Sequence, residues 1–318
     1  MNSTEMMIKA PQNNNKKLFK RSTKRLVFYS LMVTLPVLQV AIFYVYVNIN
    51  SFLLAFKNYT SYFDAEFARF DNFQWAFEQL GRSGYMFKHS LINFASSLFL
   101  SLGLSIIFSY YLAKKFPMSG FFKTILFMPQ ILSSVVLVVL FRYIVCDVYM
   151  VIGEQLTGEV VQPLLDDTDT SGRTFGTLVF FHVWAGFGAQ VLMFTGAMSG
   201  IDESVIEAAH LDGTSVMQEF FYITMPLIWH TFVTYFVTTM AGIFTNQMNI
   251  YTFFGDAGYN FATMGYYLFS TAKKADLFTP EVTNYSQLSA LGLVLTFIVL
   301  PLTLGAKKLL TKFGPSVD

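Results

Sequence analysis

Six long apolar stretches limit the fold of this 318-residue chain more than any other feature of its sequence. Each is long enough to cross the hydrocarbon core of a bilayer, which takes about 20 helical residues. Their approximate bounds are 26–47, 87–112, 121–145, 175–198, 227–250 and 288–310. Because lipid offers the backbone no hydrogen-bond partners, such stretches must be helical. The sequence therefore predicts an all-α integral membrane protein with about six transmembrane helices.

The residue composition supports this prediction and excludes several classes of site. Only 13% of the residues are charged, whereas soluble domains average about 25%. The single cysteine, Cys146, excludes an internal disulfide and any multi-cysteine metal site. The four histidines show no metal-binding spacing and are interpreted as packing or interface residues. We therefore expect no metal, no resident cofactor and no nucleic-acid partner, and membrane lipid around the spans.

The distribution of basic residues predicts the topology. Residues 1–25 are polar and basic, and no small-residue cleavage site follows the first apolar stretch, which we interpret as a retained span. Thirteen of the 21 Lys and Arg residues fall on one side if the amino terminus is cytoplasmic. Since cytoplasmic segments carry an excess of Lys and Arg, both termini are predicted to be cytoplasmic. The expected parts are a basic segment 1–25, a transmembrane domain 26–312 and a short tail 313–318.

The predicted inner loop 200–226, between the fourth and fifth spans, breaks this charge pattern. It has no Lys or Arg and five acidic residues, which are Asp202, Glu203, Glu207, Asp212 and Glu219. A loop without positive charge gains nothing from anionic lipid headgroups. It therefore favours contact with a protein, although an ordinary amphipathic connector between two membrane helices is the alternative.

Local signals divide this loop into two short helices with a corner. Asp202 can cap the first helix, and Ser215 with Gln218 has the spacing of a capping box for the second. Gly213 lies where a helix would end in the left-handed conformation, and Pro226 suits the first turn of the following span. Such a corner is expected to expose Ala208 and Ala209, whose small side chains let another surface approach the backbone.

At this point the residues match a known family. The residues Glu207, Ala208, Ala209, Gly213, Ile223 and Pro226 resemble the EAA signature of ABC importer permeases, with Met225 where the family usually has Leu. Residues 70–73, 127–134 and 255–263 are similar to other family elements, although the last lacks its usual Pro. The resemblance extends over roughly residues 25–310, and the most similar subgroup is the carbohydrate-uptake permeases of the maltose and multiple-sugar type.

The resemblance implies a type I importer fold and a mechanism. The EAA loop would be a coupling helix seated on a cytoplasmic ATPase, and an extracytoplasmic binding protein would deliver a sugar or oligosaccharide. A second homologous permease, in a heterodimer, and two ATP-binding subunits would complete the complex in a bacterial cytoplasmic membrane. The chain has no Gly-x-x-x-x-Gly-Lys-[Ser/Thr] phosphate loop, so it is expected not to be an enzyme. ATP and Mg²⁺ would bind the partner ATPase.

Polar residues within the spans are candidates for a solute path. The candidates are Asn93, Gln190, Asn246, Gln247, Asn249 and Tyr251. Amide groups can hydrogen-bond sugar hydroxyls without net charge, and aromatic rings can stack on a pyranose. The alternative is that each amide ties two helices together, as amides often do in lipid.

Two other transport functions remain open at this stage. An ABC permease for glycerol phosphate, polyamine or peptide would share the EAA loop, but anionic cargo favours basic residues, which the spans almost lack. A secondary transporter usually has an ionisable residue within a span or two sequence repeats, and neither is found here. The sequence leaves the solute and the identity of the partner subunits open.

Overall fold

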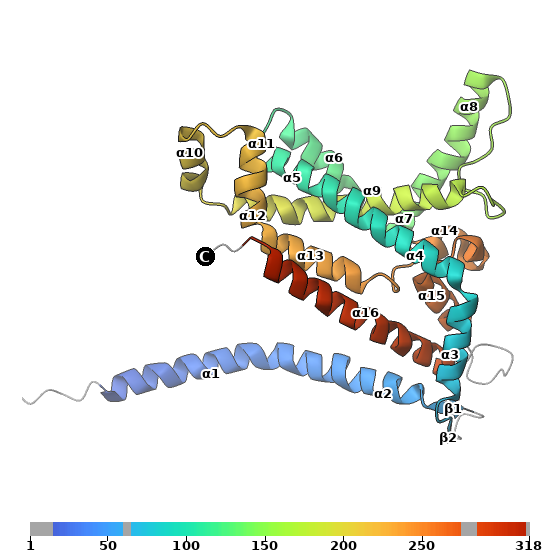
Figure 1. Cartoon of the computed structure of the whole chain (residues 1–318), viewed down its shortest axis with the longest axis horizontal. Coiled ribbons are helices and arrows are strands. Elements are labelled where there is room, and N and C mark those ends of the chain that lie inside the picture. Colours follow the sequence, from blue (N-terminus) through green and yellow to red (C-terminus); the bar gives the residue numbers. More distant parts are fainter. Residues whose placement is uncertain (1–14, 60–64, 275–284, 316–318) are drawn as a thin grey trace, which may run out of the picture. The chain divides into compact units, whose positions relative to one another are not determined.

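The computed structural model describes residues 15–59, 65–274 and 285–315, and the chain divides into two compact units, Met1–Leu54 and Ala55–Asp318. The first unit is a long helix built from α1 (Asn15–Gln39), a π-helical segment η1 (Val40–Tyr46) and α2 (Val47–Leu54) (Figure 1). Its most apolar window is 0% buried, which suits a helix surrounded by lipid or by another membrane helix. Residues 1–14 of the predicted basic segment, and 316–318 of the predicted tail, lie outside the described residues.

The second unit begins with a small hairpin that the sequence did not predict. Strands β1 (Lys57–Tyr59) and β2 (Ala65–Phe67) pair antiparallel, with Lys57 opposite Phe67. Helix α3 (Asp71–Arg82) follows. The buried Asn72 side chain donates hydrogen bonds to the carbonyl oxygens of Ala55 at 3.0 Å and Lys57 at 3.2 Å, and these bonds fix the hairpin to α3.

Two long spans form the centre of this unit. The first joins α4 (Gly84–Ser96), a π-helical segment η2 (Ser97–Leu102) and α5 (Gly103–Ala113), and the second is α9 (Arg173–Ser199). Ser105 and Ser109 are fully buried. Their hydroxyls donate to Gln190 Oε1 and to the carbonyl of Val191, both at 2.9 Å. Small residues let membrane helices approach closely, so these serines allow α5 to pack directly on α9.

The structure corrects the third predicted span. Residues 121–145 do not form one helix, because α6 (Ser119–Ile131) ends and α7 (Ser134–Tyr143) starts again after two extended residues, Leu132 and Ser133. The Ser133 hydroxyl accepts the Val136 N–H and caps α7. The long apolar helix is instead Ser134–Thr157, in which α7 continues through η3 (Ile144–Val148) into α8 (Tyr149–Thr157).

After α9 the chain forms α10 (Glu203–Leu211), α11 (Val216–Glu219), the π-helical segment η4 (Phe220–Thr224), α12 (Met225–Leu227) and α13 (Trp229–Ala241). Helix α10 and helix α8 lie at opposite ends of α9 (Figure 1). The segments Val216–Leu227 and Trp229–Ala241 meet at 68°. The predicted fifth span, 227–250, is therefore too long, since α13 ends at Ala241 and a turn follows in which Met248 and Asn249 have positive φ.

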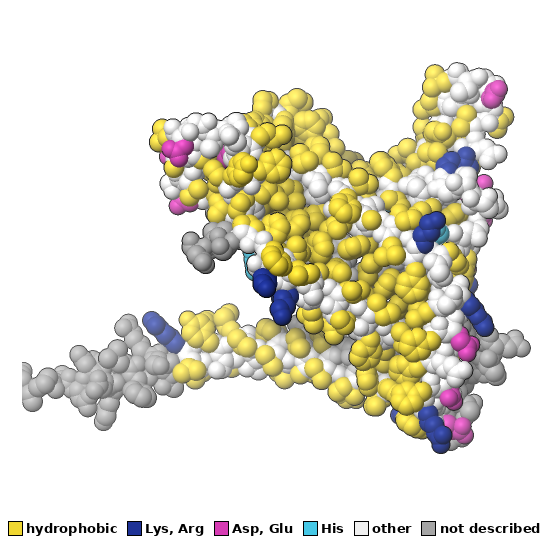
Figure 2. Space-filling model, in the orientation of Figure 1, with side chains coloured by type: hydrophobic (Ala, Val, Ile, Leu, Met, Phe, Trp, Pro, Cys, Tyr) yellow, Lys and Arg dark blue, Asp and Glu magenta, His cyan; other side chains and the backbone are white. Residues whose placement is uncertain are grey.

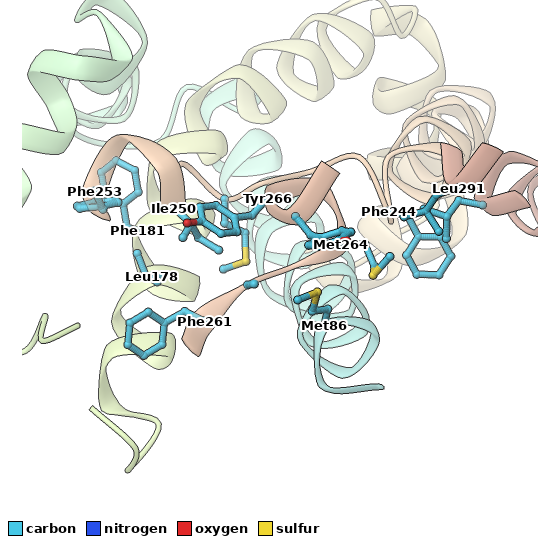
Figure 3. Packing of buried hydrophobic residues seen from close by; sticks show 14 of the residues in the cluster. Met86, Leu178, Phe181, Phe244, Ile250, Phe253, Phe261, Met264, Tyr266 and Leu291 are labelled. Atoms are coloured by element: carbon cyan, nitrogen blue, oxygen red, sulfur yellow. The ribbon is translucent and has the colours of Figure 1, made fainter. Parts of the chain in front are cut away.

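The carboxyl-terminal part contains α14 (Ile250–Phe254), a 3₁₀ helix η5 (Gly255–Phe261), α15 (Met264–Lys274) and the span α16 (Tyr285–Phe313). The largest buried cluster collects side chains from these elements, from α4 and from α9. Figure 3 shows part of this cluster and labels Met86, Leu178, Phe181, Phe244, Ile250, Phe253, Phe261, Met264, Tyr266 and Leu291. This core holds the turn after α13 against α15.

Five described helices are long and apolar enough to cross a membrane, or six if the bent pair counts as one span. The first, second, fourth and sixth predicted spans coincide with Lys24–Leu54, Gly84–Ala113, Arg173–Ser199 and Tyr285–Phe313. Hydrophobic side chains cover the middle of the second unit, and Asp and Glu side chains gather over α10 at one end (Figure 2). The prediction of a helical, multi-pass membrane protein is confirmed.

Candidate functional site

A cavity of about 410 Å³ lies where the span Gly84–Ala113, helix α9 and helix α13 meet. The span contributes Asn93, Phe94, Ser97 and Ser101. Helix α9 contributes His182, Gly186, Ala189, Gln190 and Met193. Helix α13 and the following turn contribute Tyr235, Thr238, Thr239, Gly242, Ile243 and Asn246. The volume falls within the ~300–1,000 Å³ range of small-molecule sites.

The cavity wall formed by the span Gly84–Ala113 carries several polar side chains. Ser97 and Ser101 belong to the π-helical segment η2, and such segments often occur at functional sites. One turn before them, Asn93 is 3% exposed, and its Oδ1 has no hydrogen-bond partner among the described residues. A buried polar atom without a partner is costly, so Asn93 is suited to accept a hydrogen bond from a molecule in the cavity.

The opposite wall is held by a hydrogen-bond network around Asn246. Its Nδ2 lies 3.2 Å from His182 Nε2, and its Oδ1 accepts the Met248 N–H at 2.8 Å. The Thr263 hydroxyl, from the segment before α15, donates to the Asn246 carbonyl at 2.9 Å. These bonds fix the side chains of Asn246 and His182 at the cavity.

The chemistry of the lining is polar and neutral. It combines amide, hydroxyl and imidazole groups with the rings of Phe94 and Tyr235, and none of the described residues that line the cavity is Asp, Glu, Lys or Arg. Such a lining can exchange several hydrogen bonds with a hydroxylated molecule and can cover an apolar ring face. It has no fixed charge to balance an ionised ligand.

The structure brings together three of the six solute-path candidates. Asn93, Gln190 and Asn246 line the cavity, whereas Gln247, Asn249 and Tyr251 do not. Asn249 adopts φ 56° at the start of α14. The Tyr251 ring lies 5.1 Å from the Phe269 ring and 4.6 Å from Lys273 Nζ. A role for these three residues in solute transfer stays a prediction.

Sequence reasoning missed several lining residues. His182 was interpreted as a packing residue, and Ser97, Ser101, Tyr235, Thr238 and Thr239 were not selected. The serines of the second span recur every four residues at 97, 101, 105 and 109, which places them on one helix face. This spacing was the available signal for a polar seam between two spans.

The loop between α9 and α13 is a second candidate site, and its predicted caps and corner are confirmed. Pro226, however, lies in α12 before the bend and not in the first turn of α13. Asp202 Oδ1 accepts the Ser204 N–H at 3.0 Å and the Ser204 hydroxyl at 2.8 Å. These hydrogen bonds hold the pKa of Asp202 below its ordinary value, so it stays ionised at the start of α10. Ser215 and Gln218 form the capping box of α11. Gly213 has φ +76°, the left-handed conformation expected at the corner.

One prediction about this loop is wrong. Ala208 is exposed, but Ala209 is buried, because the chain folds back over it after the corner. The Thr214 hydroxyl donates to the Ala209 carbonyl at 2.6 Å. Glu207 is exposed and has no ion pair within the described part of the chain. Ile223 and Pro226 are partly buried in η4 and α12.

Sequence reasoning also missed Glu219, which it counted among the five acidic residues of the loop without assigning it a role. Its side chain is 1% exposed, forms an ion pair with Lys114 Nζ and lies within hydrogen-bond distance of His210 Nε2, at 2.9 Å. Lys114 follows α5, and His210 lies in α10. A buried carboxylate therefore connects both helices to α11.

The surface of α10, α11 and η4 is rich in exposed apolar side chains. They include Val205, Leu211, Val216, Met217, Phe221 and Tyr222, of which Leu211 is 89% exposed. Exposed apolar groups of this kind, rimmed by polar residues, mark interaction surfaces. The loop thus exposes Glu207 and Ala208 as well as these apolar side chains.

Comparisons with known proteins agree with these features. The profile of the family described as "binding-protein-dependent transport system inner membrane component" matches residues 101–318. The probable ABC transporter permease protein YurN of Bacillus subtilis is 27% identical over 222 residues, covering 68% of this chain and 72% of YurN. The galactooligosaccharides transport system permease protein GanP of the same species is 28% identical over 220 residues, covering 66% of this chain but 50% of GanP.

The fold also matches a solved structure. A chain from the crystal structure of a bacterial ABC transporter involved in the import of the acidic polysaccharide alginate superposes with a TM-score of 0.71. The match covers 93% of this chain and 99% of that chain, at 18% sequence identity. At this identity the similarity concerns the fold, which confirms the predicted permease architecture.

Proposed function

The chain belongs to the family of binding-protein-dependent transport system inner membrane components, and on that premise we propose that it is the permease subunit of an ATP-driven importer. The proposed solute is a neutral sugar or oligosaccharide. The observation that carries this choice is the cavity between the span Gly84–Ala113, α9 and α13, whose described lining is polar and uncharged. GanP, a relative of this chain, is named for galactooligosaccharide transport.

The cavity suits a neutral carbohydrate better than an anionic one. A uronate polymer such as alginate carries a carboxylate on each sugar, and binding it in a low-dielectric site requires a compensating cation. The described lining has no Lys or Arg. Asn93, Gln190, His182 and Asn246 instead offer donors and acceptors that match hydroxyl groups.

We assign the ATPase-coupling role to α10, the corner after it and the helical segment that continues through η4 and α12. The residues of this site are Glu207, Ala208, Ala209, Gly213, Ile223 and Pro226. Exposed Glu207 and Ala208, together with the exposed apolar side chains of α10, α11 and η4, offer a surface for another protein. Buried Ala209 contributes through its backbone, because its carbonyl accepts the Thr214 hydroxyl and so connects α10 to the segment after the corner.

The proposed complex follows from this assignment. Two ATP-binding subunits on the cytoplasmic side bind ATP and Mg²⁺ and perform the hydrolysis, so this chain is not itself an enzyme. A second, homologous permease completes the path as a heterodimer, and an extracytoplasmic binding protein delivers the solute. Both termini and α10 are then cytoplasmic, and the protein is a multi-pass component of a bacterial cytoplasmic membrane.

The experiment that tests this function is reconstitution of the complete transporter with its binding protein in proteoliposomes. Uptake and ATP hydrolysis are measured with a galacto-oligosaccharide, an arabino-oligosaccharide, a maltodextrin and an alginate oligosaccharide. We expect ATP-dependent uptake of at least one neutral compound and none of the alginate. Uptake of alginate alone would contradict the solute class, and uptake that continues without ATP would contradict the importer assignment.

A further inference from the structure

Glu219 differs from the other acidic residues of its loop because it is buried. Asp202, Glu203, Glu207 and Asp212 are exposed, whereas the Glu219 side chain is 1% exposed. Burying an ionised carboxylate is costly unless it is paired and hydrogen-bonded. A buried carboxylate here therefore points to a role beyond solubility.

The partners of Glu219 come from two other helices. Lys114 Nζ, at the end of α5, ion-pairs with Oε1, and His210 Nε2, on α10, lies 2.9 Å from Oε2. Tyr110, one turn before Lys114, adds two contacts to the same junction. Its hydroxyl donates to the Val216 carbonyl at 3.3 Å, and its ring packs edge-on against Phe220 at 5.0 Å between centroids.

Helix α5 continues from this junction to the cavity. It is the last part of the span Gly84–Ala113, which also carries the lining residues Asn93, Ser97 and Ser101. A helix is stiff along its axis, so a displacement at Lys114 reaches these residues without any further contact. The hydrogen bonds from Ser105 and Ser109 connect α9, which forms another wall of the cavity, to the same span.

We propose that Glu219 is a positioning residue that transmits movement of α10 to the span Gly84–Ala113 and so drives the rearrangement of the cavity. The proposal rests on the proposed function, in which α10 is seated on the ATPase. Separating Glu219 from Lys114 would take the cation away from a buried carboxylate, and separating it from His210 would remove a hydrogen bond to the same group. The three elements therefore move together when the ATPase moves α10.

The test uses a reporter in the cavity, so it does not depend on the identity of the solute. In the complete transporter, Cys146→Ser removes the native thiol and Thr238→Cys places a new one in the lining. The labelling rate of this thiol with a maleimide is measured without nucleotide and with ATP plus vanadate. Co-purification of the ATPase with the chain is measured on the same samples.

In this background we expect nucleotide to change the labelling rate. In Glu219→Gln, which keeps the side-chain volume and removes the charge, the ATPase stays attached but the nucleotide-dependent change falls by about tenfold or more, the scale expected for loss of a charge-assisted contact. Lys114→Met should give the same result. If Glu219→Gln does not accumulate in the membrane, Lys114→Met alone tests the role of the ion pair. The reciprocal exchange Lys114→Glu with Glu219→Lys restores the nucleotide-dependent change in labelling rate. This result would show that the pairing of the two charges matters, and not either residue alone.

Glu159→Gln is the matched control, because Glu159 is an exposed acid outside the loop between α9 and α13, and it should behave like the background protein. A full nucleotide-dependent change in both Glu219→Gln and Lys114→Met would overturn the inference while leaving the coupling role of α10 intact. Normal ATPase attachment together with full uptake in Glu207→Lys, or no nucleotide-dependent change in the background protein, would contradict the proposed function, and the inference would fall with it.

Discussion

Gly265 lies in α15, where an added methyl group would press on the turn that carries the cavity residue Asn246. A Cβ at this position would lie 2.6 Å from the carbonyl carbon and oxygen of Asn246 and from the carbonyl carbon of Thr245. Ordinary carbon contacts are about 3.5–4.0 Å, so Gly265→Ala requires a shift of about 1 Å in backbone that cannot rotate away. Overpacking of this kind typically costs about 1–3 kcal/mol.

The shift falls on the turn that positions Asn246. The contact of Asn246 with His182 at 3.2 Å and the hydrogen bond from Thr263 at 2.9 Å would both be strained. We therefore expect Gly265→Ala to lower the midpoint of thermal unfolding by several degrees and to raise the solute concentration for half-maximal uptake. Attachment of the ATPase should be unchanged, because α10 lies in another part of the fold.

Thermal unfolding of the purified complex and concentration-dependent uptake in proteoliposomes measure these effects. Gly292→Ala is the control, since a Cβ there meets no atom within 4 Å and the exchange favours a helix by about 0.5–1 kcal/mol. Equal unfolding midpoints and equal uptake curves for Gly265→Ala and the unmodified protein would refute the inferred close approach of α15 to the cavity wall.

Three further predictions concern the two sites. Glu207→Lys should release the ATPase or leave it hydrolysing ATP without uptake, by repulsion in the docking cleft, while Glu159→Lys should retain both attachment and uptake in the same pull-down and transport assays. Gly213→Val should weaken ATPase attachment, because a β-branched residue is strained at φ +76°. Membrane insertion, measured by cell fractionation, should not change, and normal ATPase attachment would contradict the need for a left-handed residue at this corner. Asn246→Ala should alter uptake kinetics or solute preference more than Tyr251→Ala, because only Asn246 lines the cavity; the reverse order would place the path elsewhere.

Local chemistry made the α10–α11 corner predictable from sequence. Asp202, Ser215 and Gly213 each act through backbone groups within a few residues, so their spacing alone specifies the caps and the left-handed turn. Most spans were predictable for a similar reason, since a long charge-free run has one stable state in lipid.

The break in the third predicted span was invisible to hydropathy. Residues 121–145 are apolar on both sides of Leu132 and Ser133, so an average over the segment cannot detect a two-residue interruption. Ser133 was the local indication, because Ser often caps the helix after it. Pro129 did not mark the break, since α6 continues through it to Ile131.

The cavity and the Glu219 junction depend on contacts between segments that are distant in sequence. Asn93, Gln190 and Asn246 meet only after three helices have packed. Glu219 looks like an ordinary loop carboxylate until Lys114 from another connection is brought to it. The burial of Glu219 therefore could not be derived without knowing how the helices pack. The same holds for which three of the six path candidates line the cavity.

The uncharged lining has a consequence for the electrical behaviour of the transporter. Moving one elementary charge through the membrane field is worth about 2.3 kcal/mol per 100 mV. If charged side chains of the solute path moved during transport, the membrane voltage would therefore speed or slow that movement. The described residues around the cavity have no side chain of this kind. A neutral solute passing between these walls therefore displaces almost no charge, and its rate of entry should stay the same when the vesicle membrane is polarised or depolarised.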